Sequence, residues 1–196
     1  MHMFEKIQAW DEKWVVKINN TNFNSVIKNI FIYFTHIASI IPWIVVTVTL
    51  FLVDQAELAV FLGFGLISFG VIQSSFKLLV HRKRPYKNKK IKDKIELRDI
   101  LLRNGGQSMP SGHVTTFTLM SLMLVYFFGN YYLLIFTVAG LIFVGYSRVY
   151  LGAHYPTDVF CGVISGILFL LLAIILKEAV FNVYNSLYEI FFVAVV

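Results

Sequence analysis

Long apolar runs alternate with short polar breaks along most of this chain of 196 residues. A helix needs roughly 20 apolar residues to cross about 30 Å of hydrocarbon. The pattern therefore predicts spanning helices over 39–53 (or beginning somewhat earlier), 56–80, 111–128, 131–150 and 157–176. Short breaks at Asp54-Gln55 and Gly129-Asn130 are typical of tight turns, so successive spans should run up and down.

The flanking segments are amphipathic, short or interrupted by polar residues. Residues 4–18 alternate charged and apolar positions at helical spacing, which predicts an amphipathic helix in the membrane interface. Its apolar stripe comprises Phe4, Ile7, Trp10, Trp14 and Ile18. Residues 25–38 are apolar but short, and we expect them at the interface or oblique in the bilayer. Residues 178–196 predict an interfacial C-terminal helix, with a sixth span as the alternative.

Composition agrees with a membrane protein. Hydrophobic residues make up 58% of the chain and charged residues 14%, whereas soluble domains carry about a quarter charged residues. The single cysteine, Cys161, excludes an internal disulfide and a cysteine-based metal site. We predict an all-α, polytopic membrane helical bundle of about five to six spanning helices. One domain, 1–196, would comprise interfacial helices (1–38), a catalytic bundle (39–177) and the C-terminal helix.

Polar residues gather at the ends of the predicted spans, where each is a functional candidate because charge is costly in a bilayer. In an up-and-down bundle, the end of the second span, the start of the third, the end of the fourth and the start of the fifth share one membrane face. The set that converges there is Lys77, Arg84, Ser111, Gly112, His113, Arg148, His154 and Asp158.

This set has the chemistry of a phosphate site. Three fixed cations suit a phosphate dianion, and a helix start at Ser111-Gly112 offers a hydroxyl and backbone N–H groups to the same anion. Asp158 stands four residues after His154, where a carboxylate can orient the ring and stabilise its cation. We therefore assign His154 as nucleophile and His113 as general acid. A zinc or magnesium site is disfavoured, because the cations outnumber the single carboxylate.

Two further histidines lack such company. We interpret His36 as a polar interface residue and His81 as part of a basic loop between the second and third spans. For any one site residue taken alone, the ordinary alternative is a snorkelling arginine or a satisfied polar contact. Their convergence on one face favours the site.

The same residues resemble the three motifs of the type 2 phosphatidic acid phosphatase superfamily. Lys77 with Arg84-Pro85 matches the first motif, 110–113 (Pro-Ser-Gly-His) the second, and Ser147-Arg148 with His154 and Asp158 the third. The resemblance implies a phosphohistidine on His154, supported by Asp158, and His113 as proton donor. It also implies phosphate ligands at Lys77, Arg84, Ser111, Gly112 and Arg148, with no cofactor.

The substrate and the membrane side stay open at this point. The chain is similar to small bacterial members that act on undecaprenyl diphosphate, and others act on phosphatidylglycerophosphate, phosphatidic acid or lipid A 1-phosphate. A catalytically silent lipid-binding or lipid-translocating protein is the alternative of a different class. The expected partners are a lipid phosphate and the bilayer, without nucleic acid, and the motifs leave the oligomeric state undetermined.

The active face also carries the basic loop. Its residues are Arg82, Lys83, Arg84, Lys87, Lys89, Lys90, Lys92, Lys94, Arg98 and Arg103. On the opposite face we place Lys177. The positive-inside rule favours a cytoplasmic active face, whereas the resemblance implies an extracytoplasmic one on the bacterial cell membrane. We follow the resemblance, because the loop could instead hold an anionic head group or bilayer surface.

Overall fold

The computed structural model describes residues 3–99, 101 and 106–193, and this part of the chain is helical without β-strands. The all-α prediction is confirmed. The long helices are α1 (Met3–Asn19), α2 (Ser25–Ile37), α3 (Ile40–Leu52), α4 (Ala56–Leu79), α5 (Gly112–Phe128), α6 (Tyr131–Tyr150) and α7 (Pro156–Tyr188). Short turns of 3-10 helix cover Pro85–Lys87 and Lys92–Lys94, and a π-helical turn covers Glu189–Val193.

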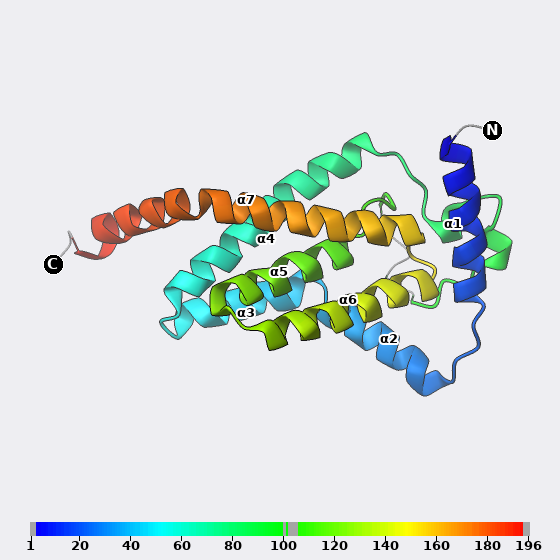
Figure 1. The fold of residues 1–196 in the computed structure, drawn as a ribbon, viewed down its shortest axis with the longest axis horizontal. Helices are drawn as coiled ribbons and strands as arrows, with labels where there is room; N and C mark the ends of the chain where they lie inside the picture. Colours follow the sequence, from blue (N-terminus) through cyan, green and yellow to red (C-terminus); the bar gives the residue numbers. More distant parts are fainter. Residues whose placement is uncertain (1–2, 100, 102–105, 194–196) are drawn as a thin grey trace.

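Helix α5 lies at the centre of the bundle and packs against α4, α6 and α7 (Figure 1). The approach to α7 is close because Gly162 and Gly166 face α5. A Cβ atom on Gly162 would lie 3.0 Å from the Ser111 carbonyl oxygen, and one on Gly166 would lie 2.9 Å from that of Thr115. These two glycines allow the backbones of α5 and α7 to pack closely near the polar N-terminal ends of both helices.

Three described helices, α4, α6 and α7, are long and apolar enough to cross a membrane. Helices α2 and α3, which meet at an angle of 49°, pass the same test together as a possible fourth span. Helix α5 is apolar but, with 17 residues, is shorter than these candidate spans. The predicted independent span over 39–53 is therefore corrected: α3 is one arm of a bent pair. Ser39 is extended and Pro42 stands in the first turn of α3, where its missing N–H is tolerated.

Helix α7 also departs from prediction. The sequence pattern separates an interfacial segment after Lys177, but α7 runs without interruption to Tyr188. No proline or glycine follows Gly166 within it, so the hydrogen-bond ladder has no cause to break. Its 33 residues rise about 50 Å, which exceeds the roughly 30 Å of hydrocarbon. Figure 1 shows its end projecting past the other helices.

Helix α1 lies across the end of the bundle, against α6 and α7 (Figure 1). It is amphipathic as predicted, and the first part of its apolar stripe stays accessible, with Trp10 47% exposed, whereas Ile18 packs against the protein. An adjacent face, which carries Asp11, Val15 and Asn19, is fully buried against the protein. The Asn19 amide donates to the Glu96 and Tyr150 carbonyls at 2.9 and 2.8 Å. The helix therefore presents one face to the bilayer and docks through the other.

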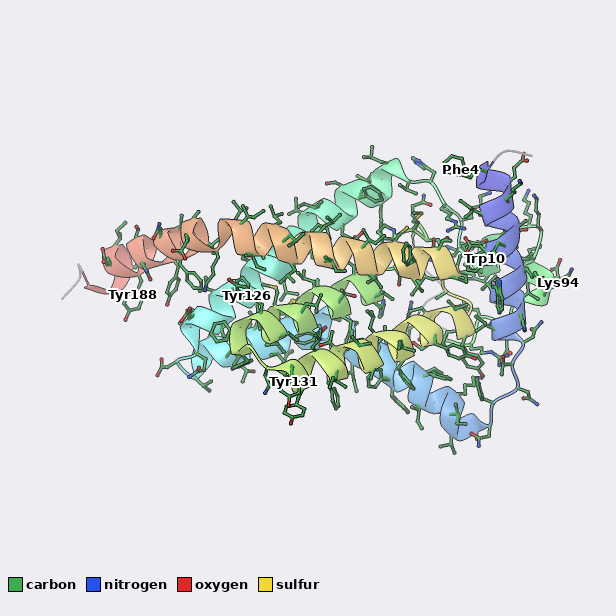
Figure 2. All side chains as sticks on the ribbon, viewed as in Figure 1. Phe4, Trp10, Lys94, Tyr126, Tyr131 and Tyr188 are labelled. Carbon is green, nitrogen blue, oxygen red and sulfur yellow. The ribbon has the colours of Figure 1, made fainter. Side chains whose placement is uncertain are left out.

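Aromatic side chains occur toward both ends of the molecule. Figure 2 shows Phe4 and Trp10 at the end covered by α1, and Tyr126, Tyr131 and Tyr188 toward the opposite end. All five are at least 44% exposed. Belts of exposed aromatic residues at two levels are typical of the two interfaces of a bilayer. With the apolar helices between them, they identify an integral membrane protein.

Candidate active site

The predicted site residues meet at the end of the bundle that α1 covers. The last turn of α4, the first turn of α5, the last turn of α6 and the first turn of α7 all reach this end (Figure 1). The Ser111 N–H donates to the Asp158 carbonyl at 3.0 Å, and the Gln73 amide of α4 donates to the Pro110 carbonyl at 3.4 Å. These two bonds tie the start of α5 to its neighbours on both sides.

A glycine-dependent turn brings His154 back toward α6. Gly152 follows the end of α6 with φ of +75°, in the left-handed region, and a Cβ there would lie 2.9 Å from the Glu96 carbonyl. Glycine is the residue that accepts this conformation without strain. The backbone N–H groups of Ala153 and His154 then donate to the Arg148 carbonyl at 3.1 and 3.2 Å. The turn thus fixes His154 over Arg148, and its side chain is 1% exposed.

The two ring nitrogens of His154 face different groups. Nδ1 lies 3.7 Å from Asp158 Oδ2, which is longer than a hydrogen bond but close enough for an ionic contact. Nε2 lies 3.3 Å from Arg84 Nη1. Burial lowers the pKa of His154 to about 3, with Asp158 opposing the shift and Arg84 and Arg148 adding to it. The ring is therefore neutral at pH 7, with a lone pair available on the nitrogen that does not carry its proton.

Asp158 is held firmly at the third position of α7. Its Oδ2 accepts from the Tyr155 N–H at 2.8 Å, which completes a capping box, and from the Ser108 hydroxyl. Its Oδ1 accepts from Arg82 Nη1 at 2.6 Å. The carboxylate is fully buried, so these bonds replace the water that it would otherwise bind. Both oxygens have fixed directions, and Oδ2 is the one that faces His154.

Arg84 reaches His154 from the loop after α4. Its Nε donates to the Gly106 carbonyl at 2.9 Å, and its Nη1 lies 3.5 Å from the Ala153 carbonyl. Arg84 is 7% exposed, and burial lowers its pKa. The loop carbonyls orient the planar guanidinium, leaving its Nη1 edge beside the histidine.

Arg148 and Ser111 carry buried polar atoms for which the described part of the chain supplies no partner. Arg148 is 1% exposed and donates through Nη1 to Thr35 Oγ1 at 3.1 Å, but its Nε has no hydrogen-bond partner among the described residues. The fully buried Ser111 hydroxyl is likewise without a partner in the described part of the chain. Unpaired buried polar groups cost about 1–3 kcal/mol each, and more when charged. Such groups beside a histidine are suited to an anion.

Lys77, Gly112 and His113 complete the predicted set. Lys77 Nζ lies 3.5 Å from the position that a Cβ would take on Gly112, so the ammonium and the start of α5 adjoin one another. His113 stands in the first turn of α5 and is half-buried. The structure therefore gathers residues from all three motifs. Their catalytic and binding roles remain predictions.

Several residues at the site belong to none of the three sequence motifs. Arg82, Ser108 and Thr35 contact the predicted set through side-chain bonds, and Asp11 contacts Arg82. Arg82 could have been suspected from its place two residues before Arg84. Asp11 and Thr35 come from α1 and α2, far away in sequence, so no local pattern indicates them.

His36 has a carboxylate partner that the sequence did not indicate. We interpreted it as an isolated polar residue at the interface, but its Nε2 lies 2.8 Å from the buried Asp99 Oδ2. It follows Thr35, which contacts Arg148, so α2 contributes to the wall of the site. His81 is exposed in the basic loop, as predicted.

The basic loop divides into structural and exposed cations. Arg82, Arg84 and Arg98 make side-chain bonds to the protein, and Arg103 lies outside the described residues. The exposed members are Lys83, Lys87, Lys89, Lys90, Lys92 and Lys94. The buried side chains of Ile91 and Ile95 pack with Val15 of α1 and hold the loop in place. The exposed ammonium groups therefore stand on an ordered support near the site.

A cavity of about 650 Å³ lies beside α1, and its lining contains none of the predicted phosphate-binding residues. Its walls are mainly apolar, and Arg82 and Lys90 of the basic loop contribute to them. Among the described residues, no three His, Cys, Asp or Glu side chains gather closely enough to hold a metal ion.

Comparison with known proteins adds family evidence to this geometry. A family model described as the PAP2 superfamily matches residues 58–181, a range that includes every predicted site residue. Curated protein sequences give no match. The chain is similar to the crystal structure of Aquifex aeolicus LpxE, with a TM-score of 0.70 and 21% identity over 83% of this chain and 93% of that chain.

A second solved structure shares the fold. It is described as the first transmembrane PAP2 type phosphatidylglycerolphosphate phosphatase from Bacillus subtilis. The TM-score is 0.66 and the identity 23%, over 89% of this chain and 87% of that chain. At these identities, the two similarities show that the helical architecture is shared.

Proposed function

This chain belongs to the PAP2 superfamily, and from that premise we propose that it hydrolyses a phosphomonoester or diphosphate of a lipid through a phosphohistidine intermediate. The observation that carries the proposal is that two buried groups in the site of the neutral His154, Arg148 Nε and Ser111 Oγ, have no hydrogen-bond partner among the described residues. A phosphate in contact with them would satisfy both groups and present phosphorus to the histidine.

The first half-reaction transfers the phosphoryl group to the protein. His154 Nε2 attacks phosphorus, a P–N bond forms, and the P–O bond to the lipid breaks while His113 gives a proton to the departing oxygen. Arg84, Lys77 and Arg148 stabilise the negative charge on the equatorial oxygens. Asp158 stabilises the ring cation that develops on His154.

The second half-reaction restores the enzyme. Water attacks the phosphohistidine and gives a proton to His113, now a base, as the P–N bond breaks and inorganic phosphate leaves. His154 returns to its neutral form and His113 to its protonated form. No cofactor enters either step.

For the substrate we propose undecaprenyl diphosphate, converted to undecaprenyl phosphate. Phosphatidylglycerophosphate, phosphatidic acid and lipid A 1-phosphate are the alternatives, since the site described here recognises the phosphate rather than the lipid. The test is phosphate release by purified protein in mixed micelles, with each of these four lipids in turn. Undecaprenyl diphosphate should give the highest kcat/KM. Binding of all four lipids without phosphate release would instead support a silent lipid-binding or lipid-translocating protein.

Turnover should be unaffected by chelation of divalent metals. The cationic side chains around His154 already supply the charge stabilisation that a metal would give to the transferring phosphoryl group. We expect full activity after exhaustive treatment with EDTA and micromolar inhibition by vanadate, which mimics a five-coordinate phosphorus. Loss of activity on chelation, restored by zinc or magnesium, would contradict this mechanism.

We propose that the active face lies on the extracytoplasmic side of the bacterial inner membrane. The exposed lysines of the basic loop stand at this face, and Figure 2 shows Lys94 at the same end as Trp10. The positive-inside rule alone would place them in the cytoplasm. We attribute to five of them, Lys87, Lys89, Lys90, Lys92 and Lys94, the attraction of anionic lipid toward the mouth of the site.

Replacing the loop lysines should therefore change substrate capture more than chemistry. In the five-lysine variant, Gln replaces Lys87, Lys89, Lys90, Lys92 and Lys94. This variant should have a higher KM at low salt and a nearly unchanged kcat. Single exposed charges contribute under about 1 kcal/mol, but five act together until salt shortens the screening length to about 10 Å at 0.1 M. Kinetics in mixed micelles across ionic strength measure the effect.

The control for the loop variant is Lys177→Gln at the opposite end of the bundle, which should leave KM unchanged at every salt concentration. A C-terminal reporter fusion of wild type and of the five-lysine variant separately tests the orientation of the chain in the membrane. Unchanged kinetics together with inverted topology would assign the lysines to orientation and contradict the capture role.

A further inference from the structure

Arg82 lies between two fully buried carboxylates from opposite ends of the sequence. Its Nη1 donates to Asp158 Oδ1 at 2.6 Å, and its Nη2 donates to Asp11 Oδ2 of α1. The guanidinium also stacks on the Tyr155 ring, 4.2 Å from the ring centre. A planar fork with two donor edges can bind two carboxylates at once, which an ammonium cannot do with the same geometry.

Helix α1 holds this arrangement from outside the bundle. Asp11 Oδ1 accepts from the Thr157 N–H at 3.1 Å, and Asp11 Oδ2 accepts from the Thr157 hydroxyl. The Gln8 side chain accepts from Arg82 Nη2 at 2.9 Å. Asp11 thus bonds both the start of α7 and Arg82, and Gln8 adds a second bond from α1 to Arg82. These contacts connect α1 through Arg82 to Asp158, the carboxylate that faces His154.

The charge arrangement favours a protonated Arg82 throughout the working pH range. Burial lowers its pKa, but Asp158 and Asp11 outweigh that effect and raise it. Because Arg82 occupies Oδ1 of Asp158, the other oxygen faces His154 and the two groups that donate to it. Removing either carboxylate partner would leave buried charge uncompensated, so the three groups are interdependent.

We propose that Arg82 is a positioning residue, anchored by Asp11, through which the docking of α1 fixes Asp158 and thereby His154 for attack. The proposal rests on the proposed role of His154 as nucleophile. In this arrangement α1 is part of the active-site assembly as well as a membrane-surface helix. Arg82 acts through Asp158 and does not contact the phosphate.

The test measures phosphate release by Asp11→Asn, Arg82→Gln, Arg82→Lys and the double variant that combines Asp11→Asn with Arg82→Gln. The control is Lys83→Gln, because Lys83 is exposed. Outer partners that orient metal-bound histidines are worth about ten- to a hundredfold in activity, and we expect a similar range here. Asp11→Asn should lower kcat about tenfold and Arg82→Gln about a hundredfold. Both should leave KM within about twofold, since the phosphate ligands are intact. Arg82→Lys should recover part of kcat.

Non-additivity separates positioning from general destabilisation. If Asp11 acts through Arg82, the double variant should be no slower than Arg82→Gln alone. Multiplied losses, or wild-type kcat in Asp11→Asn, would overturn the proposal. Asp11→Asn keeps the side-chain shape and the Arg82–Asp158 pair, so it remains informative if Arg82→Gln does not fold, which thermal unfolding in detergent will show.

A measurement without substrate distinguishes failure of this inference from failure of the proposed function. Nitrogen NMR of histidine-labelled protein in nanodiscs reports the tautomer of His154, assigned with His154→Gln. Asp11→Asn and Arg82→Gln should each change the tautomer population, and Lys83→Gln should not. Unchanged spectra overturn the positioning role whatever the activity. Changed spectra in a protein that hydrolyses none of the tested lipids retain the coupling and reject the proposed function.

Discussion

Replacing His154 with alanine should reduce turnover by at least about a thousandfold, because no other group can take the place of an attacking nucleophile. The structure gives this residue a neutral ring, one nitrogen near Asp158 and the other beside Arg84. Phosphate release from the preferred lipid in detergent measures the loss. His81→Ala is the matched control, since His81 is exposed and should retain full activity.

Trapping the intermediate gives the same prediction a direct readout. Rapid acid-free quenching with radiolabelled substrate should leave an acid-labile phosphate on wild type and none on His154→Ala. The variant should keep the wild-type elution profile and unfolding temperature, since alanine leaves the backbone bonds to Arg148 in place. Near-wild-type turnover, or label on another residue, would contradict the assignment of His154 as nucleophile.

The convergence of the motif residues was predictable because it follows from topology alone. Up-and-down spans must bring the end of α4, the start of α5, the end of α6 and the start of α7 to one membrane face. The polar residues at those four ends mark that face. Asp158 was identifiable as the partner of His154 because a carboxylate four residues after a histidine can orient its ring. In the structure the pair lies 3.7 Å apart.

The contributions of α1 and α2 were not predictable in the same way. Asp11 contacts Arg82 across 71 residues, and nothing in the spacing of an amphipathic helix tells which polar residue will be buried. The pattern marked an apolar stripe on α1, but the helix docks through an adjacent face that carries Asp11 and Asn19. Likewise, Thr35 reaches Arg148 because α2 packs against α6. Contacts of this kind depend on tertiary packing.

The continuation of α7 has a local cause that hydropathy did not weigh. Lys177 and Glu178 lower the hydropathy of the window, which suggested the end of a span. Both are strong helix formers, however, and no breaker follows them before Tyr188. A change in the depth of burial in the bilayer and the end of a helix are separate events, and the sequence pattern reports the first more directly.

Among the proposed phosphate ligands, Arg84 should be the most sensitive to substitution. Arg84→Lys should lower kcat by about a hundredfold for every substrate. Its planar fork lies 3.3 Å from His154 Nε2, so a phosphoryl group under attack there would be held on the same edge. Lysine retains the charge but loses the flat two-donor geometry and the Nε bond to the Gly106 carbonyl.

Arg84→Lys has a matched control one residue away. Lys83 is exposed, and Lys83→Arg should leave kcat and KM unchanged, which separates the effect of the site from that of loop charge. The decisive comparison is single-turnover phosphorylation of His154 at saturating substrate with two lipids of different head groups. An equal fall in rate for both lipids supports a ligand of the transferred phosphate. A loss confined to one lipid, or a change in KM alone, would instead make Arg84 a head-group residue and leave the transition-state charge to Lys77 and Arg148.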